Sequence, residues 1–368
     1  MSDQKIRIAI LGTGMSLKVF HRPSIIFHED KFVLHSVLER SGKGRAKEVC
    51  GDSIKVATTY DEILADSEVD LVVVSTPNNT HFPFAKAALE AGKHVLIEKP
   101  MCITAAQGQE LKELADAKAL ILSVYQNRRW DSDFLTVQKL LKSGKLGELV
   151  DFASNYDRYR PLPASHVPGA TWKEQPGEHN DVIYNLGSHI IDQLYVLFGM
   201  PDKVACRFSD VRGVGVDEGF HMTLFYPPTP GTASSPFVAT VQGSILSCLP
   251  AQQRFLIRGT KGSFIKYGVD PQEAHLKKVG NATQVSGDWG VEQPEAWGTL
   301  FEARPAAEGE QYESVKGDYN ALYANLYEAI KGGKDKLIVK PEQAIDVLRI
   351  IELGQKAAKE ERIVSARE

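Results

Sequence analysis

The feature that most limits the possible folds of this chain is a glycine turn between an apolar run and a helical segment near its start. Ile6 to Leu11 is rich in β-formers, Gly12-Thr13-Gly14 follows, and Met15 to Ile26 carries apolar residues at helical spacing. In this context, backbone N–H groups at a helix start can hold the pyrophosphate of a dinucleotide, so Gly12, Gly14 and Met15 are candidate cofactor contacts. Leu17 stands where GxGxxG has its third glycine, and an ordinary strand-to-helix turn therefore stays open at this point.

Strand-length apolar runs alternate with helical patterns through the first 124 residues. The predicted strands are 6–11, 32–38, 69–75, 95–97 and 120–124, with helical patterns between them. Such alternation is typical of right-handed βαβ units and a doubly wound parallel sheet. We therefore expect a dinucleotide-binding domain over residues 1–124.

Charged residues follow the second predicted strand. Glu39 stands about 25 residues after the first glycine, where an acid commonly binds the ribose hydroxyls of NAD. Arg40, Ser41 and Lys43 come directly afterwards and could instead hold the 2′-phosphate of NADP. The sequence leaves NAD and NADP both open.

Polar residues also follow the third and fourth predicted strands, at the sheet edge where open α/β folds bind ligands. Lys99 there is either a solvated surface cation or a working acid, and Glu98 precedes it. The segment after the third strand, with Thr76, Pro77, Asn78 and His81, could contact the cofactor. A helix-capping asparagine and a surface histidine explain Asn78 and His81 equally well.

The remainder predicts a second domain over residues 125–340, followed by a helix at 341–359. Strands are expected at 150–159, 204–211, 220–226, 237–246 and 254–267, a helix at 319–331, and a long loop region at 270–315. A predicted helix at 182–198 carries Asn185, His189 and Asp192 on one face beside its apolar stripe. That face either opens onto a site or is partly solvated with a core histidine.

Asn127, Arg128 and Arg129 follow the fifth predicted strand. They are candidates for contacts to substrate hydroxyl or carboxylate groups. Structural ion pairing is an equally good interpretation of the two arginines.

Composition narrows the class of protein. The 368 residues carry a net charge of −4, and a pI near 6.2 disfavours nucleic acid as a main partner. Four widely spaced cysteines predict reduced thiols and no zinc framework, and no segment approaches 18 apolar residues. We expect a cytoplasmic protein with no membrane partner and no metal.

Four stretches together resemble the Gfo/Idh/MocA oxidoreductases, the glucose–fructose and inositol dehydrogenase-type proteins. They are AILGTGMSLKVFHRPSI, VVVSTPNNTH, AALEAGKHVLIEKPM and YNLGSHIIDQL. YQNRRWDSDF, SGKLGEL and GTKGSFIKYG are most similar to the YhhX-type branch. The resemblance covers essentially the whole chain.

The resemblance implies an N-terminal Rossmann domain and a C-terminal α+β domain. The open, mostly antiparallel sheet of the second domain is expected to build a homodimer or homotetramer, and the last helix to pack back on the first domain. It implies NAD(P)-dependent hydride transfer at a sugar or polyol carbon. Lys99 matches the catalytic lysine of the EKP motif, and His189 the second proton-handling residue.

Asn185 departs from the family pattern, in which many enzymes have an aspartate four residues before this histidine. An amide cannot exchange that proton, but it can bind a substrate hydroxyl. Asp192 is displaced along the helix, so it is more suited to orienting neighbouring groups or to packing than to replacing the missing aspartate. Two other functions remain: a cofactor-binding regulator without turnover, and an NAD-dependent glycosidase of the same superfamily.

Overall fold

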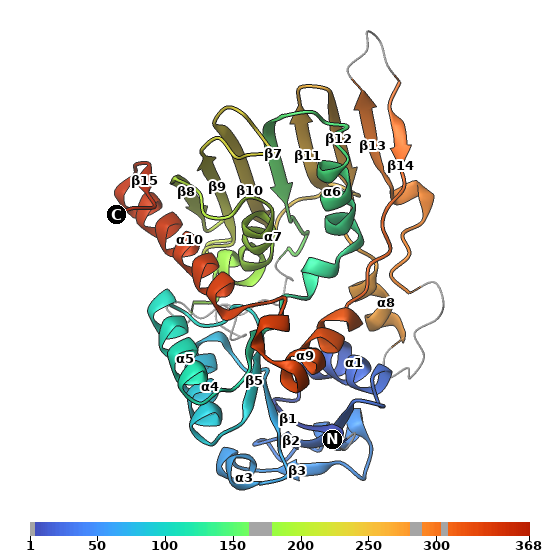
Figure 1. The fold of residues 1–368 in the computed structure, drawn as a ribbon, viewed down its shortest axis with the longest axis vertical. Helices are drawn as coiled ribbons and strands as arrows, with labels where there is room; N and C mark the ends of the chain where they lie inside the picture. Colours follow the sequence, from blue (N-terminus) through green and yellow to red (C-terminus); the bar gives the residue numbers. More distant parts are fainter. Residues whose placement is uncertain (1–3, 162–178, 280–288, 303–307) are drawn as a thin grey trace. The chain divides into compact units, whose positions relative to one another are not determined.

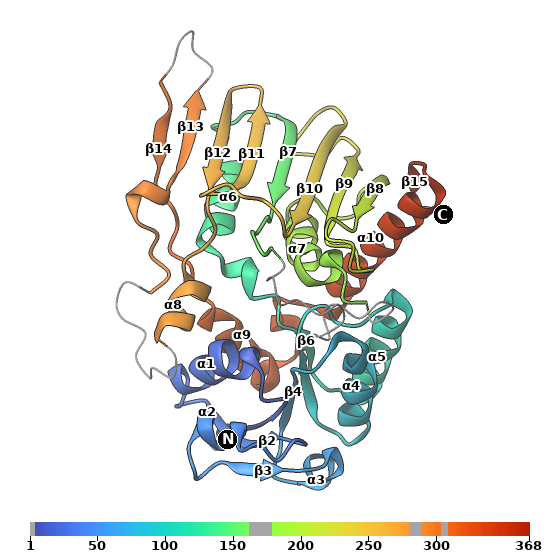
Figure 2. The same cartoon turned by 180° about the vertical axis from the view of Figure 1, so that it is seen from behind.

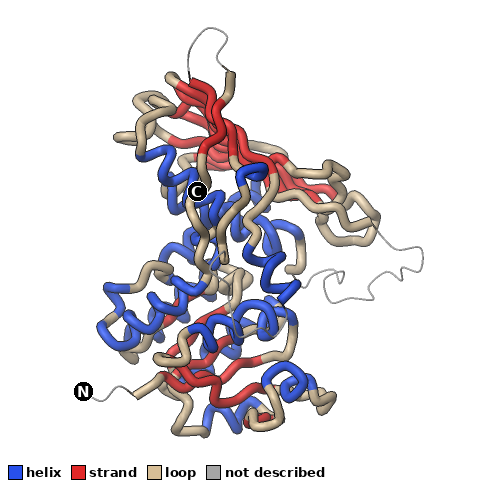
Figure 3. The backbone as a smooth tube through the Cα atoms, turned by 90° about the vertical axis from the view of Figure 1, so that its right-hand side faces the viewer, coloured by secondary structure: helices blue, strands red, loops and turns tan. Residues whose placement is uncertain are grey.

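The computed structural model describes residues 4–161, 179–279, 289–302 and 308–368. Two compact units divide the chain. The first contains residues 1–130, 271–289 and 318–345, and the second contains residues 131–270, 290–317 and 346–368. Each unit has its own sheet (Figure 3).

The first unit is built on a six-stranded parallel sheet with the order β3-β2-β1-β4-β5-β6. This order confirms the predicted doubly wound sheet. The short strand β3 was not predicted. The strands are β1 (Ile6–Leu11), β2 (Phe32–Leu38), β3 (Lys55–Ala57), β4 (Leu71–Val74), β5 (His94–Ile97) and β6 (Leu122–Val124).

Helices cover both faces of this sheet, as its apolar central strands require. Helices α4 and α5 lie on one face, with α1 and α9 on the other (Figures 1 and 2). The core of the second face includes Ile8, Phe32, Tyr323 and Leu326, which are buried. The helices are α1 (Arg22–Phe27), α2 (Arg45–Cys50), α3 (Tyr60–Ala65), α4 (His81–Glu90), α5 (Ala105–Ala117), α8 (Gln272–Val279) and α9 (Asn320–Gly332).

Shorter helical turns connect these elements. A π-helical segment, η1 (Leu17–His21), precedes α1. The 3₁₀ turns of this unit are η2 (Asn78–Thr80), η3 (Asn127–Trp130) and η7 (Lys334–Lys336).

The second unit is built on a nine-stranded, mostly antiparallel sheet with the order β14-β13-β12-β11-β7-β10-β9-β8-β15. Among the described strands of this sheet, only β7 and β10 pair in parallel. Helices α6 (Ser132–Lys142), α7 (Ser188–Phe198) and α10 (Pro341–Glu360) lie against one face, and no helix among the described residues covers the other (Figures 1 and 2). This architecture confirms the α+β domain that the family resemblance implied.

The strands of this sheet are β7 (Leu149–Asn155), β8 (Lys203–Ser209), β9 (Gly219–Tyr226), β10 (Phe237–Ser244), β11 (Gln253–Gly259), β12 (Gly262–Tyr267), β13 (Gly298–Glu302), β14 (Glu310–Tyr312) and β15 (Val364–Ser365). The predicted strand 254–267 is a hairpin, because the chain turns between Gly259 and Gly262. The predicted loop at 270–315 contains α8, a 3₁₀ turn η6 (Pro294–Ala296), β13 and β14, while residues 280–288 and 303–307 lie outside the described residues.

The two C-terminal helices belong to different units. We expected the last helix to pack on the first domain, and the structure differs from this. Helix α9 belongs to the first unit, whereas α10 is divided after Ile345 and most of it belongs to the second. Hydrogen bonds explain this division, since Tyr195 donates its hydroxyl to Asp346 and Tyr184 donates to Gln355. These contacts join α10 to the segment that carries His189.

Candidate cofactor and catalytic site

The ends of four strands meet at one edge of the parallel sheet. Leu11 of β1 is in register with Leu38 of β2 and with Val74 of β4, and Val74 is in register with Ile97 of β5. The next residue of each strand therefore emerges at this same edge. These residues are Gly12, Glu39, Ser75 and Glu98, and Lys99 follows Glu98.

The two glycines of the turn have different roles. Gly12 has a φ of +111°, and a Cβ there would lie 2.4 Å from the carbonyl oxygen of Ser75. Only glycine fits this position. A Cβ at Gly14 would meet nothing within 4 Å, so the space above that backbone is open. Together with exposed Met15, this open turn fits the close approach of a pyrophosphate.

A π-helical segment, η1, begins two residues after the turn and places His21 beside Glu98, the residue that precedes the motif lysine. Nδ1 of His21 lies 2.9 Å from the hydroxyl oxygen of Tyr323, and Nε2 lies 3.2 Å from Oε1 of Glu98. Burial alone would raise the pKa of Glu98, but His21 and the Lys99 charge bring the net pKa below its ordinary value. π-Segments of this kind are frequent at functional sites.

Glu98 and Lys99 differ in exposure. The Glu98 side chain is buried, and its Oε2 accepts a hydrogen bond from the backbone N–H of Lys99 at 3.2 Å. Lys99 itself is partly exposed, and its peptide bond to Pro100 is cis. The motif therefore holds its glutamate inside the unit and leaves its lysine accessible to solvent.

His81 joins the segments that follow β4 and β5. Its Nδ1 lies 2.7 Å from the carbonyl oxygen of Pro100, and its Nε2 lies 2.9 Å from that of Thr76. The ring is buried, and burial lowers the pKa of His81. His81 is thus not a surface histidine, and it ties the Thr76–Pro77 turn to the Lys99–Pro100 turn. Asn78 is buried in the same turn.

The arginines after β6 make contacts within the first unit. Arg128 is buried and donates to Glu273 at 2.5 Å. Arg129 donates to the carbonyl oxygen of Ile338 and to the side chain of Gln343. These contacts favour structural pairing for the two arginines. Asn127 is buried beside them.

The helix that carries His189 begins with a second π-helical segment, η5 (Ile183–Gly187). Asn185 lies in this segment, and its amide nitrogen donates to the carbonyl oxygens of Asn180 and Asp181. His189 and Asp192 are buried on α7. The second unit therefore holds all three predicted residues on one continuous helical segment.

A buried arginine anchors α7 to the sheet of the second unit. Arg254 donates to Asp133 at 3.0 Å, to Ser154 at 2.7 Å and to Gln193 at 2.5 Å. Its guanidinium also lies 4.0 Å from the ring centroid of Phe255. Gln193 is one turn beyond His189, so this network orients the histidine-bearing helix.

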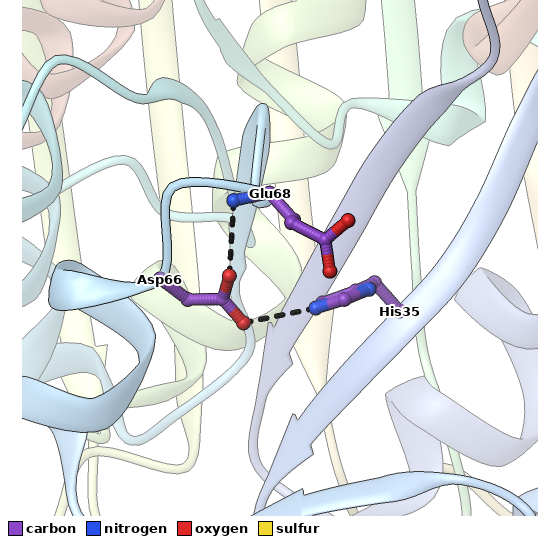
Figure 4. Close-up of side chains that lie close together, drawn as sticks. All are labelled: His35, Asp66 and Glu68. Atoms are coloured by element: carbon purple, nitrogen blue, oxygen red, sulfur yellow. Dashed lines mark hydrogen bonds and ion pairs between the residues drawn. The ribbon is translucent and has the colours of Figure 1, made fainter.

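His35, Asp66 and Glu68 have metal-ligand chemistry and lie close together in the first unit (Figure 4). Asp66 accepts from Lys55 at 2.7 Å and lies 2.9 Å from Nε2 of His35, while Glu68 pairs with Arg7. The Lys55 hydrogen bond, followed by the His35 contact, lowers the pKa of Asp66. Because cations already satisfy both carboxylates, this cluster is an ion-pair network.

Profile matches decide the family. The profile of the oxidoreductase family with an NAD-binding Rossmann fold matches residues 6–126, and that of its C-terminal alpha/beta domain matches residues 138–365. The chain belongs to the Gfo/Idh/MocA oxidoreductase family. It is accordingly an oxidoreductase with a nicotinamide dinucleotide as its cofactor.

Similar proteins cover nearly the whole chain. The uncharacterized oxidoreductase YhhX of Escherichia coli is 35% identical, over 98% of this chain and 99% of its own. The NADP⁺-dependent scyllo-inositol 2-dehydrogenase IolW of Bacillus subtilis is 38% identical, over 98% of this chain and 95% of its own. A solved structure of the putative oxidoreductase YvaA from Bacillus subtilis has 35% identity and a TM-score of 0.86, covering 99% of both chains.

Sequence reasoning missed His21, Tyr323 and Arg254. His21 is a lone histidine in an apolar helical stretch, a pattern more typical of a core residue. Arg254 lies in an alternating strand, where an inward-facing charge is detectable only as an interruption of the apolar face.

None of the helices within the described ranges has the length and apolar character needed to span a bilayer.

Proposed function

We propose that this oxidoreductase transfers a hydride between NAD(P) and a C–OH or C=O centre of a sugar, polyol or related carbohydrate. The observation that carries the proposal is the position of Lys99. It follows β5 at the sheet edge shared with the glycine turn, and it is solvent-accessible between buried Glu98 and buried Pro100. The name of the relative IolW supports a polyol substrate.

Lys99 is proposed as the general acid and base. When bound, the nicotinamide accepts or donates the hydride. In oxidation, Lys99 as a neutral amine takes the substrate hydroxyl proton, and in reduction its ammonium form protonates the developing alkoxide. Glu98 and His81 position the lysine, through the backbone of Lys99 and the carbonyl oxygen of Pro100.

The second unit supplies the remaining proposed roles. By family resemblance His189 is the second proton-handling residue. Asn185 takes a hydroxyl-binding role rather than a proton-transfer role, because an amide cannot exchange the proton. Asp192 is proposed to orient the polar face of α7 that carries His189. Asn127 and Arg128 remain proposed substrate contacts, and Arg128 also forms an ion pair with Glu273.

The test is a panel of polyols, sugars and keto-sugars with both cofactors, followed by nicotinamide absorbance. Lys99→Ala should lower kcat by about 100- to 10,000-fold while the cofactor Kd stays within about threefold. Lys47→Ala, an exposed lysine on α2, is the matched control. Turnover that survives Lys99→Ala would remove Lys99 from the chemistry. Cofactor binding without turnover on any substrate would favour a regulator, and cleavage of aryl glycosides would favour a glycosidase.

We also propose a cytoplasmic homodimer or homotetramer formed by the helix-free face of the nine-stranded sheet. All four cysteines are free thiols, which suits a reducing compartment. Val150, Tyr267 and Phe301 are large apolar side chains of this sheet that are more than a third exposed. Light scattering should give a multiple of the 40.6 kDa chain mass. A monomer at working concentration would refute this part.

A further inference from the structure

Helix α7 runs over the sheet of the second unit in the direction opposite to β7, and its contacts fix the level of each turn. The ring centroid of Phe198, at the end of α7, lies 5.3 Å from that of Phe152 in the first half of β7. Five residues earlier, Gln193 accepts from Arg254, whose guanidinium also donates to the Ser154 hydroxyl. Each turn back along α7 therefore lies nearer the carboxyl end of β7.

The turn of α7 that carries His189 lies at the level of Tyr156, which directly follows β7. Gly187 packs on the ring of Phe220, because a Cβ there would lie 3.1 Å from that ring. Phe220 is in register with Gly243 of β10, and this part of β10 runs beside Tyr156. His189 comes two residues after Gly187 on the same helical segment, so it lies over this part of the sheet.

Arg158 directs its guanidinium to the same place. Its Cζ lies 5.1 Å from the ring centroid of Tyr156, and its Nη2 lies 3.5 Å from the Tyr156 hydroxyl oxygen. A second guanidinium near this ring, at 5.5 Å, belongs to Arg254, which reaches α7, so the ring lies on the α7 side of the sheet. The backbone of Arg158 is held firmly, since its N–H donates to Ser244 at 2.7 Å and its carbonyl oxygen accepts from Ser247 at 2.9 Å.

The two guanidiniums beside Tyr156 differ in their charge partners. Arg254 is paired with buried Asp133 at 3.0 Å. Arg158 is only partly exposed, and no carboxylate among the described residues forms an ion pair with it. A cation–π contact contributes little beside the ion pair that a guanidinium makes with a carboxylate. A partly buried arginine without such a partner, beside the turn that carries His189, therefore indicates an anionic ligand.

We infer that Arg158 is a specificity-determining residue that binds a carboxylate of the substrate, so that the enzyme prefers sugar acids to neutral sugars and polyols. One guanidinium matches one carboxylate, because its planar fork donates two parallel hydrogen bonds to the two oxygens. A phosphate monoester carries about two negative charges and would need a second cation. The inference rests on the proposed function, because it names the substrate class of that site.

The experiment compares kcat/KM for matched acid and neutral substrates, glucuronate against glucose and gluconate against sorbitol, with the full chain and NADP or NAD. The wild-type chain should use each acid at least about tenfold better. Arg158→Gln should lower kcat/KM for the acids by about 10- to 100-fold, chiefly through KM, and change that of the neutral substrates less than about twofold. Arg158→Lys should restore part of the loss, because it keeps the charge without the fork.

Arg367→Gln is the matched control, at an exposed arginine of the same unit, and it should change neither class of substrate. Equal use of acid and neutral substrates by the wild type would overturn the inference. So would equal losses for both classes in Arg158→Gln, the result expected of a purely structural arginine. A preference for glucose 6-phosphate over glucuronate would overturn the assignment to a carboxylate.

Thermal melts separate this inference from the proposed function. If no substrate of the panel is turned over, the proposed function fails, and the Tm is then compared with and without glucuronate in the presence of the cofactor. A rise in Tm that glucose does not cause and that Arg158→Gln abolishes supports the carboxylate site. No rise with glucuronate overturns it.

Discussion

Nε2 of His21 lies 3.2 Å from Oε1 of Glu98, and both side chains are buried in the first unit. One residue comes from the helix after the glycine turn, and the other precedes the motif lysine. The pair therefore joins the cofactor turn to the residue proposed for proton transfer. On the other side of the imidazole, Nδ1 of His21 lies 2.9 Å from the hydroxyl oxygen of Tyr323.

Removing His21 is expected to destabilise the fold strongly. His21→Ala leaves a buried carboxylate without its nearest partner, at a cost of about 3 kcal/mol in the free energy of unfolding. Tyr323→Phe removes only the hydroxyl contact to His21 and should cost about 1 kcal/mol. Urea unfolding measures both. If His21→Ala costs no more than Tyr323→Phe, the pair does not hold the two segments together.

Substitutions at the two glycines of the turn should have different effects: one on folding and the other on cofactor binding. Gly12→Ala meets the Ser75 carbonyl and a positive φ, so we expect several kcal/mol of destabilisation or loss of soluble protein. Gly14→Ala places its methyl group in open space and should leave the Tm within a few degrees while weakening cofactor binding at least tenfold. Thermal melts and fluorescence titration check the pair. Unchanged cofactor Kd in Gly14→Ala would place the pyrophosphate elsewhere.

His94 should contribute to the pH dependence of stability. The backbone N–H of Ile121 donates to its Nδ1 at 2.9 Å, so this nitrogen carries no proton, and burial lowers the pKa of His94. The unfolded chain binds a proton near pH 6.5, but the folded chain resists it. Stability is therefore complete above about pH 6.5 and declines as the pH falls toward the folded pKa.

His94→Asn keeps a hydrogen-bond acceptor for Ile121 but cannot titrate. The slope of unfolding free energy against pH between pH 7 and 5 should become shallower, by at most about 1.4 kcal/mol per pH unit. Urea unfolding at three pH values measures it. Identical slopes for the two proteins would show that His94 titrates alike in the folded and unfolded states.

Arg254 should be indispensable to the second unit, unlike the exposed Arg258 on the same strand. Arg254→Ala leaves Asp133 buried and uncompensated, so we expect a loss of about 3–5 kcal/mol. Arg258→Ala removes an exposed pair with Asp151 and should cost less than about 1 kcal/mol. Urea unfolding compares them. Similar costs for both variants would mean that the buried network does not anchor α7.

The parallel sheet of the first unit could be predicted because its information is local. Each apolar run is bounded by a glycine, proline or helix signal, and the βαβ connections admit one handedness. The turn at Gly12, the strand ending at Leu38 and the motif around Lys99 were therefore recognisable before the fold was known. The family resemblance extended the prediction to the second sheet, although the hairpin at 259–262 and strands β13 and β14 were missed.

Side-chain direction was decided only by tertiary structure. Glu39 stands at the spacing of a ribose-binding acid, but its carboxylate accepts hydrogen bonds from Arg45 and Ala46. His81 follows a ligand-edge strand, yet both ring nitrogens meet backbone carbonyl oxygens. The partner of a polar group depends on segments far away in the chain, which periodicity and spacing do not encode.

The sequence by itself determined that a glycine turn and Lys99 belong to one dinucleotide-binding sheet, because strand alternation and motif order are local properties of the chain. Tertiary structure decided which residues hold that edge in place. His21 reaches Glu98 through a π-helical segment, and Tyr323 joins them from a helix about 300 residues away in the sequence. Such contacts follow from how distant segments pack, and the burial they create gives these polar pairs their energetic weight.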